Sequence, residues 1–220
     1  MKFANNILLP IILMIMVISG AVTFTVFFTP LYYLDVKILD IPGQSGYSLD
    51  LISRNYDTLI NYMSVFNHGE LAFPDLAMSP MGKIHFEEVK NIFVILQILL
   101  PITAAVGIPW SIYLYIKKHE RFFFKIAGII TLALPVFLGI WAAINFDSLF
   151  ITFHKIAFRN DYWIFYPSLD PVINILPEEF FMHALILIVG IVIGMGILFL
   201  VLGRKYSKKK IKRNSKKAIK

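Results

Sequence analysis

Four long stretches of the chain contain no charged residue and are mostly apolar, and they set the fold class. They cover residues 7–28, 91–116, 126–146 and 184–202, with lengths of 22, 26, 21 and 19 residues, and none contains Asp, Glu, Lys, Arg or His. A helix needs about 20 residues to cross the hydrocarbon of a bilayer. The pattern therefore predicts an all-α membrane protein with four transmembrane helices.

The first apolar run has a second interpretation, as a cleaved secretory signal peptide. Lys2 supplies a basic flank, but the apolar part of a signal peptide spans about 7–15 residues. The run here is longer, and no clear A-x-A cleavage site follows it. We therefore favour an uncleaved first span.

Two polar segments, 29–90 and 147–183, connect spans on one side and make up nearly half of the protein. The part from Thr29 to Tyr47 contains prolines and glycines, which predict irregular chain or a short strand. Ser48 can cap a helix, and the apolar residues from Leu49 to Met63 follow helical spacing. This pattern predicts an amphipathic helix of about four turns.

Two further helix starts are visible in these polar segments. Ser79 and Pro80 have the residue types favoured at an N-cap and at the first helical position, and this helix should continue into the second span. Pro177 and the two acids after it open the fourth span in the same way. On the water side of the amphipathic helix we expect Arg54 and Asp57.

Composition supports the membrane assignment and removes several classes of site. Hydrophobic residues make up 58% of the chain and charged residues 16%, against roughly 45–50% and about 25% in soluble domains. Mean hydropathy is +0.71. The chain has no cysteine, which excludes disulfides, cysteine-ligated metals and a cysteine nucleophile within it. No metalloprotease, G-x-S-x-G or P-loop motif occurs.

Charge predicts the orientation of the spans. The N-terminus, the 117–125 loop and the C-terminal tail together hold 15 Lys and Arg and one acid, whereas the other side holds six Lys and Arg and 13 acids. Basic loops stay in the cytoplasm, so both termini are predicted to be cytoplasmic. The two polar segments 29–90 and 147–183 then form an extracellular cap, and no charge inside a span marks an ion pathway.

We therefore divide the chain into a single membrane domain, 1–203, and a basic cytoplasmic tail, 204–220. The tail has ten basic residues, which favours a flank held by anionic lipids; RNA binding is the alternative. The net charge of +7 needs no nucleic-acid partner.

The candidate chemistry lies in histidines at the outer water–lipid boundary. His85 precedes the second uncharged run by six residues, about 9 Å along a helix. His154 lies at a similar predicted depth on the other polar segment, and Glu88 is placed to reach His85 from the next turn. His68, His119 and His183 are interpreted as structural. A zinc site at His85 and His154 is the alternative, but no close histidine pair supports a metal.

Aromatic residues surround His154 in the sequence. They are Phe146, Phe150, Phe153, Phe158, Tyr162, Trp163, Phe165 and Tyr166. An interfacial belt is rich in Trp and Tyr, whereas this segment is rich in Phe, so a pocket for acyl chains is the sharper interpretation. Asn145, Asn160 and Arg159 could donate hydrogen bonds to an oxyanion.

These residues together resemble the bacterial lipoprotein intramolecular transacylase family. The matching motifs are His85-Phe-Glu-Glu88-Val-Lys, Phe153-His154-x-x-x-Phe158-x-Asn160-x-x-Trp163 and Leu176-Pro177-Glu178-x-Phe180-Phe181, and the resemblance extends to about residue 203. Two positions depart from the family pattern. Glu88 stands where Asp is expected, and Gly82 stands where a charged residue is expected.

The resemblance implies an enzyme of the bacterial plasma membrane with its active site on the extracellular face. Such enzymes move the sn-2 acyl chain of a diacylglyceryl cysteine to the α-amine of that N-terminal cysteine of a lipoprotein, without a cofactor. His85 and His154 match the catalytic histidines.

The roles of the individual residues then follow as expectations. We expect His85 as base with Glu88 orienting it, and His154 as electrophile and proton donor. Substrate contacts are expected from Asn145, Phe150, Phe158, Asn160 and Trp163. We expect the protein to be a monomer whose partners are the lipoprotein substrate and membrane lipids. The alternatives are a membrane protein whose cap binds a partner and a lipid ester hydrolase.

Overall fold

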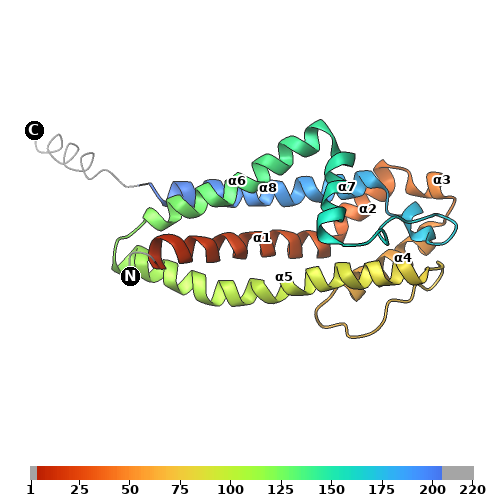
Figure 1. Cartoon of the computed structure of the whole chain (residues 1–220), viewed down its shortest axis with the longest axis horizontal. Coiled ribbons are helices and arrows are strands. Elements are labelled where there is room, and N and C mark those ends of the chain that lie inside the picture. The colour runs from red at the N-terminus through yellow and green to blue at the C-terminus, as the bar shows by residue number, and fades with distance from the viewer. Residues whose placement is uncertain (1–3, 205–220) are drawn as a thin grey trace, which may run out of the picture.

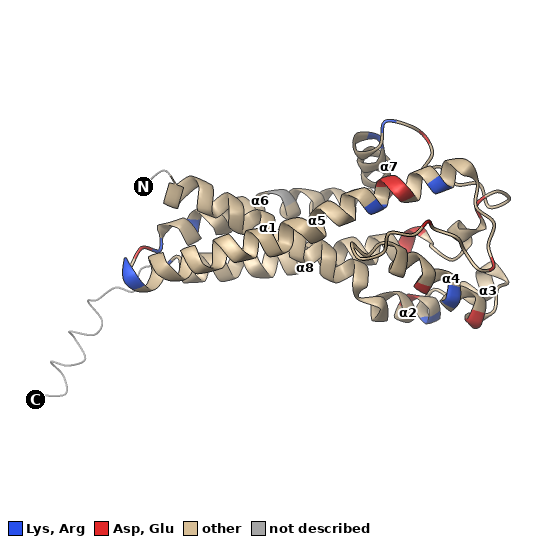
Figure 2. Cartoon of the chain, turned by 90° about the horizontal axis from the view of Figure 1, so that it is seen from below, with Lys and Arg blue, Asp and Glu red and all other residues tan. Residues whose placement is uncertain are grey.

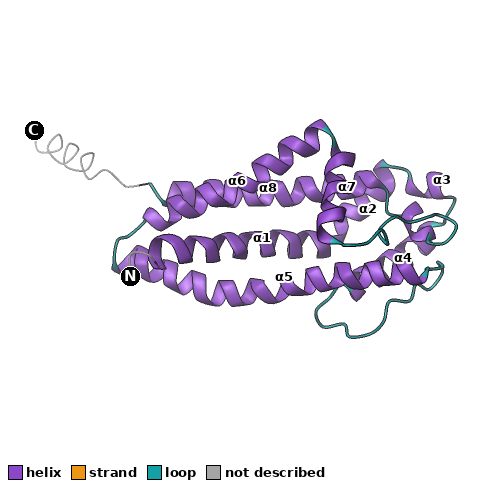
Figure 3. Ribbon diagram, in the orientation of Figure 1, coloured by secondary structure: helices purple, strands orange, loops and turns teal. Residues whose placement is uncertain are grey.

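The computed structural model describes residues 4–204, and four long helices lie side by side in it (Figure 1). They are α1 (Leu9–Phe27) preceded by the π-helix η1 (Ala4–Leu8), α5 (Pro80–Ile112) continued by η2 (Tyr113–Lys117), α6 (Phe122–Ile144) and α8 (Glu178–Leu202). Each is long and apolar enough to cross a membrane. The described residues contain helices and loops and no strand (Figure 3), so the predicted all-α class and its four long apolar helices are confirmed.

The bundle is held by close packing of small and apolar side chains. Helix α1 contacts α5, α6 and α8, and α6 approaches α8 at two glycines. A Cβ on Gly128 would lie 2.8 Å from the carbonyl oxygen of Gly196, and a Cβ on Gly196 would lie 2.7 Å from Leu132 Cγ. Because lipid offers no hydrophobic driving force between helices, such close backbone approach is what stabilises a pair of spans.

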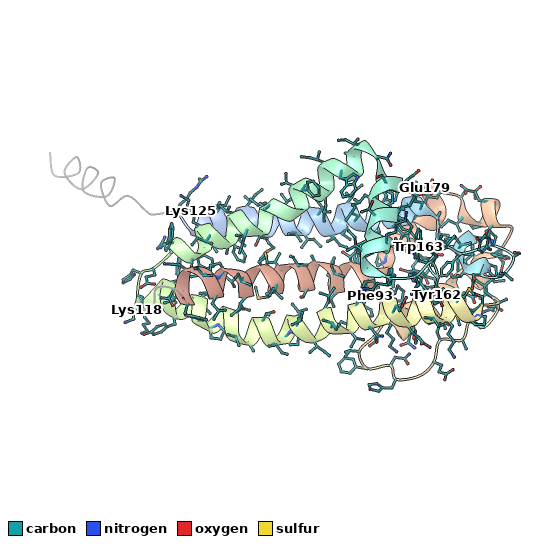
Figure 4. All side chains as sticks on the ribbon, viewed as in Figure 1. Phe93, Lys118, Lys125, Tyr162, Trp163 and Glu179 are labelled. Carbon is teal, nitrogen blue, oxygen red and sulfur yellow. The ribbon has the colours of Figure 1, made fainter. Side chains whose placement is uncertain are left out.

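Charged residues gather at the two ends of the molecule and leave the middle of the bundle apolar (Figure 2). Lys118 and Lys125 lie at the end opposite the polar segments (Figure 4). The two ends thus differ in charge, as the sequence predicts. The side of the membrane that each end faces stays a prediction. Residues 205–220, nearly all of the predicted basic tail, lie outside the described residues.

Segments 28–79 and 145–177 pack together at one end of the bundle and are called the cap below (Figure 1). The cap contains α2 (Thr29–Ile38), α3 (Ile41–Ser45), α4 (Leu49–Tyr62), α7 (Phe146–Ala157) and the 3-10 turn η3 (Pro171–Asn174). Its buried apolar core, which includes one residue of α5, consists of Tyr32, Val36, Ile41, Ile52, Tyr56, Leu59, Tyr62, Met63, Leu71, Leu76, Phe86, Val172, Ile175 and Leu176.

The prediction of irregular chain or strand over 29–47 was wrong, because this segment forms α2 and α3. Pro30 and Pro42 stand in the first turns of these helices, where proline removes no intrahelical hydrogen bond. Tyr32 is fully buried, and its hydroxyl donates to the carbonyl oxygen of Ile175 at 2.8 Å. Its ring stacks on Tyr56 at 3.5 Å between centroids. Contacts with distant parts of the chain therefore stabilise α2.

The predicted helix starts at Ser48 and Ser79 are confirmed. The Ser48 hydroxyl accepts a hydrogen bond from the Leu51 amide, and the Ser79 hydroxyl accepts one from Gly82. Helix α4 turns apolar residues into the cap and leaves Arg54 exposed, where it pairs with Asp75 at 2.8 Å. Helix α5 runs without a break from the cap into the membrane-crossing part, so its N-terminal turns are fixed to the bundle.

Candidate active site

The two candidate histidines meet although they come from different helices. His85 lies on the second turn of α5, and His154 lies near the end of α7. Their ring centroids are 5.9 Å apart, with 37° between the ring planes. His85 is 6% exposed. Two separate helices thus bring the predicted histidines into one site.

Aromatic rings enclose both imidazoles. Phe158 contacts both histidines, with centroids 4.7 Å from His85 and 5.6 Å from His154. Phe165 lies 5.5 Å from His85, and Trp163 lies 4.8 Å from His154. Phe150 is 4.1 Å from His154. The structure thus brings the predicted Phe150, Phe158 and Trp163 to the site, together with Phe165 from the same aromatic segment.

The hydrogen bond at His154 fixes its tautomer. Nδ1 lies 2.7 Å from the carbonyl oxygen of Phe150, one turn back on α7. A carbonyl oxygen only accepts, so Nδ1 carries the proton and donates. In the neutral ring, Nε2 then holds the free lone pair. Burial lowers the pKa of His154 from its ordinary value, and the bond to Phe150 partly offsets that shift. His154 can therefore accept a proton at Nε2.

Glu88 binds Asn160 and makes no hydrogen bond to His85. Asn160 Nδ2 donates to Glu88 Oε1 at 2.9 Å. The other carboxylate oxygen, Oε2, is buried without a partner, and so is His85 Nδ1. Buried polar atoms are nearly always hydrogen-bonded, and these two atoms beside the histidine pair are exceptions.

Asn160 holds the loop that follows α7. Its Oδ1 accepts from the Tyr162 amide at 3.0 Å, and its carbonyl oxygen accepts from Trp163 Nε1 at 3.1 Å. Through Glu88, Asn160 ties this loop to α5 (Tyr162 and Trp163 are labelled in Figure 4). The backbone becomes extended at Phe158, and α7 ends at Ala157.

Asp170 fixes the start of α5, a contact that the sequence did not reveal. Its Oδ1 accepts from the Ser79 amide at 2.7 Å and its Oδ2 from the Ser79 hydroxyl at 2.8 Å. The carboxylate also lies against Gly82, where a Cβ would come within 2.3 Å of Oδ1. Gly82 thus makes room for Asp170 one turn before His85, which explains why a small residue stands there. The Ser79 cap was visible in sequence, but its second partner was not.

Other sequence candidates lie elsewhere. Asn145 is exposed and caps α7, accepting from the Ser148 amide at 2.8 Å. It precedes His154 by nine residues, about 13 Å along the helix. Arg159 is exposed. His183 pairs with the buried Asp35 at 2.8 Å and thereby joins α8 to α2. Among residues 4–204, no group of three His, Cys, Asp or Glu has the geometry of a metal site.

The geometry fits proton transfer in a site lined by aromatic rings. An imidazole with a free Nε2 faces a second imidazole across 5.9 Å, and both lie among aromatic rings. A buried carboxylate oxygen and an unpartnered ring nitrogen stand one helical turn apart. Such a site can accept a proton from one ligand atom and return it to another.

Comparison with known proteins gives consistent matches. A family model for lipoprotein intramolecular transacylase Lit matches residues 7–181. The membrane integral lipoprotein intramolecular transacylase Lit from Bacillus cereus is 39% identical, with a TM-score of 0.86 over 90% of this chain and 92% of that chain. Its structure with the H85R mutation has a TM-score of 0.80, over 95% of this chain and 93% of that one. Its structure with the H85A mutation also gives 0.80. Comparison with curated proteins gave no match.

Proposed function

The chain belongs to the lipoprotein intramolecular transacylase family, and from this membership we propose a specific reaction for it. It moves the sn-2 acyl chain of a diacylglyceryl cysteine to the α-amine of that cysteine, at the N-terminus of a lipoprotein. The product is the lyso form, with one acyl chain on the glyceryl group and one on the nitrogen. The observation that carries the proposal is the His85–His154 pair in its aromatic enclosure.

The reaction is a balanced exchange of an ester for an amide. The amine nitrogen attacks the ester carbonyl carbon and loses a proton, and a tetrahedral oxyanion forms. The bond from that carbon to the glyceryl oxygen then breaks, and the oxygen takes a proton as it leaves. No electrons enter or leave, and no cofactor is required. Because amine and ester belong to one substrate, a site that folds the substrate gains rate by proximity.

We assign the base role to His154, which reverses the assignment expected from the sequence. Its Nδ1 is committed to the Phe150 carbonyl, which leaves Nε2 free to take the amine proton and return it to the glyceryl oxygen. His85, the second catalytic residue, donates to the oxyanion. Its Nδ1 lacks a protein partner, and a preorganised donor at that position is the usual source of oxyanion stabilisation.

The remaining residues position the substrate. Phe150, Phe158 and Trp163 hold acyl chains and exclude water, whose attack on the ester would release a fatty acid. Glu88 acts as a positioning residue by fixing Asn160, and thereby Trp163. We further propose that the cap is extracellular, as the asymmetry of charge between the two ends supports. The protein works as a monomer in the bacterial plasma membrane.

The decisive experiment is mass spectrometry of a diacylglyceryl lipoprotein N-terminus after incubation with purified protein in lipid vesicles. The parent should convert it to the lyso form, and His85→Ala or His154→Ala should abolish conversion while the protein stays folded and membrane-bound. His68→Ala is the matched control, because His68 is exposed on a loop, and it should retain full conversion.

Each contrary outcome has a distinct meaning. Near-normal lyso form from both histidine variants would refute the assignment of the site. Loss of the glyceryl acyl chain without N-acylation would instead identify a lipid ester hydrolase. An unchanged substrate with the parent protein would favour a cap that binds a partner.

A further inference from the structure

The loop after α4 runs back along the outer part of α5 and is bonded to it at two levels. Gln97 Nε2 donates to the carbonyl oxygen of Met63 at 2.9 Å, and Gln97 Oε1 accepts from the Val65 amide at 2.9 Å. Lys90 Nζ donates to the carbonyl oxygen of Asn67 at 2.7 Å. The loop thus spans the stretch of α5 between Lys90 and Gln97 (the chain between α4 and α5 in Figure 1).

The depth of that stretch follows from the length of the helix. Lys117 is the first charged residue after the uncharged run 91–116, and Gln97 precedes it by 20 residues, roughly 30 Å at 1.5 Å per residue. This distance equals the hydrocarbon thickness of a typical bilayer. Gln97 therefore lies at the edge of the hydrocarbon on the cap side, and Lys90 lies about 10 Å further out, among the headgroups.

Backbone polar groups of the loop have the hydrogen-bond partners that this depth requires. Where water is scarce, a non-helical chain is tolerated only if its amide and carbonyl groups find partners. Gln97 serves one of each, and the Phe66 and Gly69 amides bond to side chains of the loop itself. This explains why an amide side chain interrupts an otherwise apolar stretch of α5.

One large apolar side chain of the loop is left outside the protein. Phe66 is 88% exposed, although Val65 and Gln97 beside it are partly buried. Between the loop and the end of α1 lies an open hollow of about 390 Å³, bordered by Thr23, Phe27, Ser64, Val65, Phe66 and Gln97. The phenyl ring thus lies at the edge of the hydrocarbon without a protein partner.

We propose that the 64–69 loop is a membrane-surface anchor whose partner is the bilayer itself. Phe66 inserts between acyl chains just below the headgroups of the leaflet on the cap side, and lipid chains fill the hollow beside α1. Lys90 at the outer end of the loop meets the headgroups. The anchor holds the α4 end of the cap against the lipid surface, and it does so whatever reaction the histidine site performs.

The absence of cysteine in the chain allows a direct test. A nitroxide label is attached to the full-length protein carrying Phe66→Cys, in vesicles of phosphatidylcholine and phosphatidylglycerol. Collisions with oxygen, which concentrates in lipid, are compared with collisions with a water-soluble nickel chelate. Ile102→Cys, exposed in the middle of α5, is the lipid reference. Ser168→Cys, exposed in the cap loop near the start of α5, is the water reference.

The label at position 66 should prefer oxygen over nickel several-fold more than the label at position 168, with a ratio on the side of the position 102 label. A ratio equal to that at position 168 would overturn the proposal, because the loop would then lie in water. Low collision rates with both reagents would also overturn it, since the ring would then be packed against protein. Unchanged thermal unfolding of Phe66→Cys shows that the loop is native.

Discussion

The contact of Asp170 with the start of α5 predicts a large effect from adding a single methyl group at Gly82. The new Cβ of Gly82→Ala would lie 2.3 Å from Asp170 Oδ1 and 3.0 Å from its Cγ. Asp170 is 3% exposed and is held by two hydrogen bonds from Ser79, so its carboxylate has to give up those bonds to make room.

The magnitude follows from the bonds lost. Hydrogen bonds to a charged group contribute about 1.5–3 kcal/mol each, and alanine is favoured over glycine inside a helix by about 1 kcal/mol. The net destabilisation is therefore about 2–5 kcal/mol, which lowers the melting temperature by on the order of 10 °C for a protein of this size. Since His85 lies one turn further along α5, formation of the lyso form should also fall by at least about tenfold, because small misplacements in an active site cost that much.

The assay compares thermal unfolding in detergent and the rate of lyso-form production for two alanine variants. Gly190→Ala is the matched control, because a Cβ at Gly190 of α8 meets nothing within 4 Å, and it should leave both measurements unchanged or slightly raise stability. Asp170→Asn tests the charge, since an amide keeps the shape and one acceptor oxygen. Its melting temperature and activity should lie between those of Gly82→Ala and Gly190→Ala. If Gly82→Ala unfolds at the same temperature as Gly190→Ala and keeps full activity, the role given to Asp170 is refuted.

Two further predictions concern the pH dependence of the reaction and the stability contributed by the buried His183–Asp35 pair. Burial lowers the pKa of His154 from its ordinary value of about 6.5, so above pH 6.5 the base is mostly neutral, and the substrate amine, with a pKa of about 8, is the group that titrates. The logarithm of the single-turnover rate should then rise with a slope of about one between about pH 6.5 and 7.5, and a slope of two in that range would contradict this. His183→Ala leaves the Asp35 carboxylate, 1% exposed, without its partner, and should lower unfolding free energy by about 2–3 kcal/mol. Asp35→Asn in the same chain should recover most of this loss, and a melting temperature of His183→Ala equal to that of His68→Ala would exclude the pair as a stabilising contact.

Local signals in the sequence located the helix starts well. Ser48 and Ser79 accept hydrogen bonds from the amides three residues on, as their residue types predict. The apolar spacing after Leu49 also placed α4, because a helix with one buried face carries its period in the sequence. Segment 29–47 has no such period, and α2 is held by Tyr32, whose partners Tyr56 and Ile175 come from other parts of the cap.

The candidate site, too, was predicted only in part from the sequence. His85 and His154 were recognised as candidates because both lie near the predicted boundary of the spans, together with the motifs around them. Three contacts could be seen only in the structure. They are the hydrogen bond between Glu88 and Asn160, the hydrogen bonds of Asp170 to the start of α5, and the hydrogen bond that fixes the tautomer of His154. The last of these changed which histidine we assign as base.

The sequence alone determined that four helices cross a membrane and that charge separates the two ends, because hydropathy and charge are properties of a segment by itself. The tertiary structure decided which polar atoms are partnered in the cap. His85 and His154 come from helices far apart in the chain, and periodicity gives the face of a helix but not the helix that packs against it. Their 5.9 Å separation therefore arises only once the bundle and the cap core have fixed α5 and α7 in space.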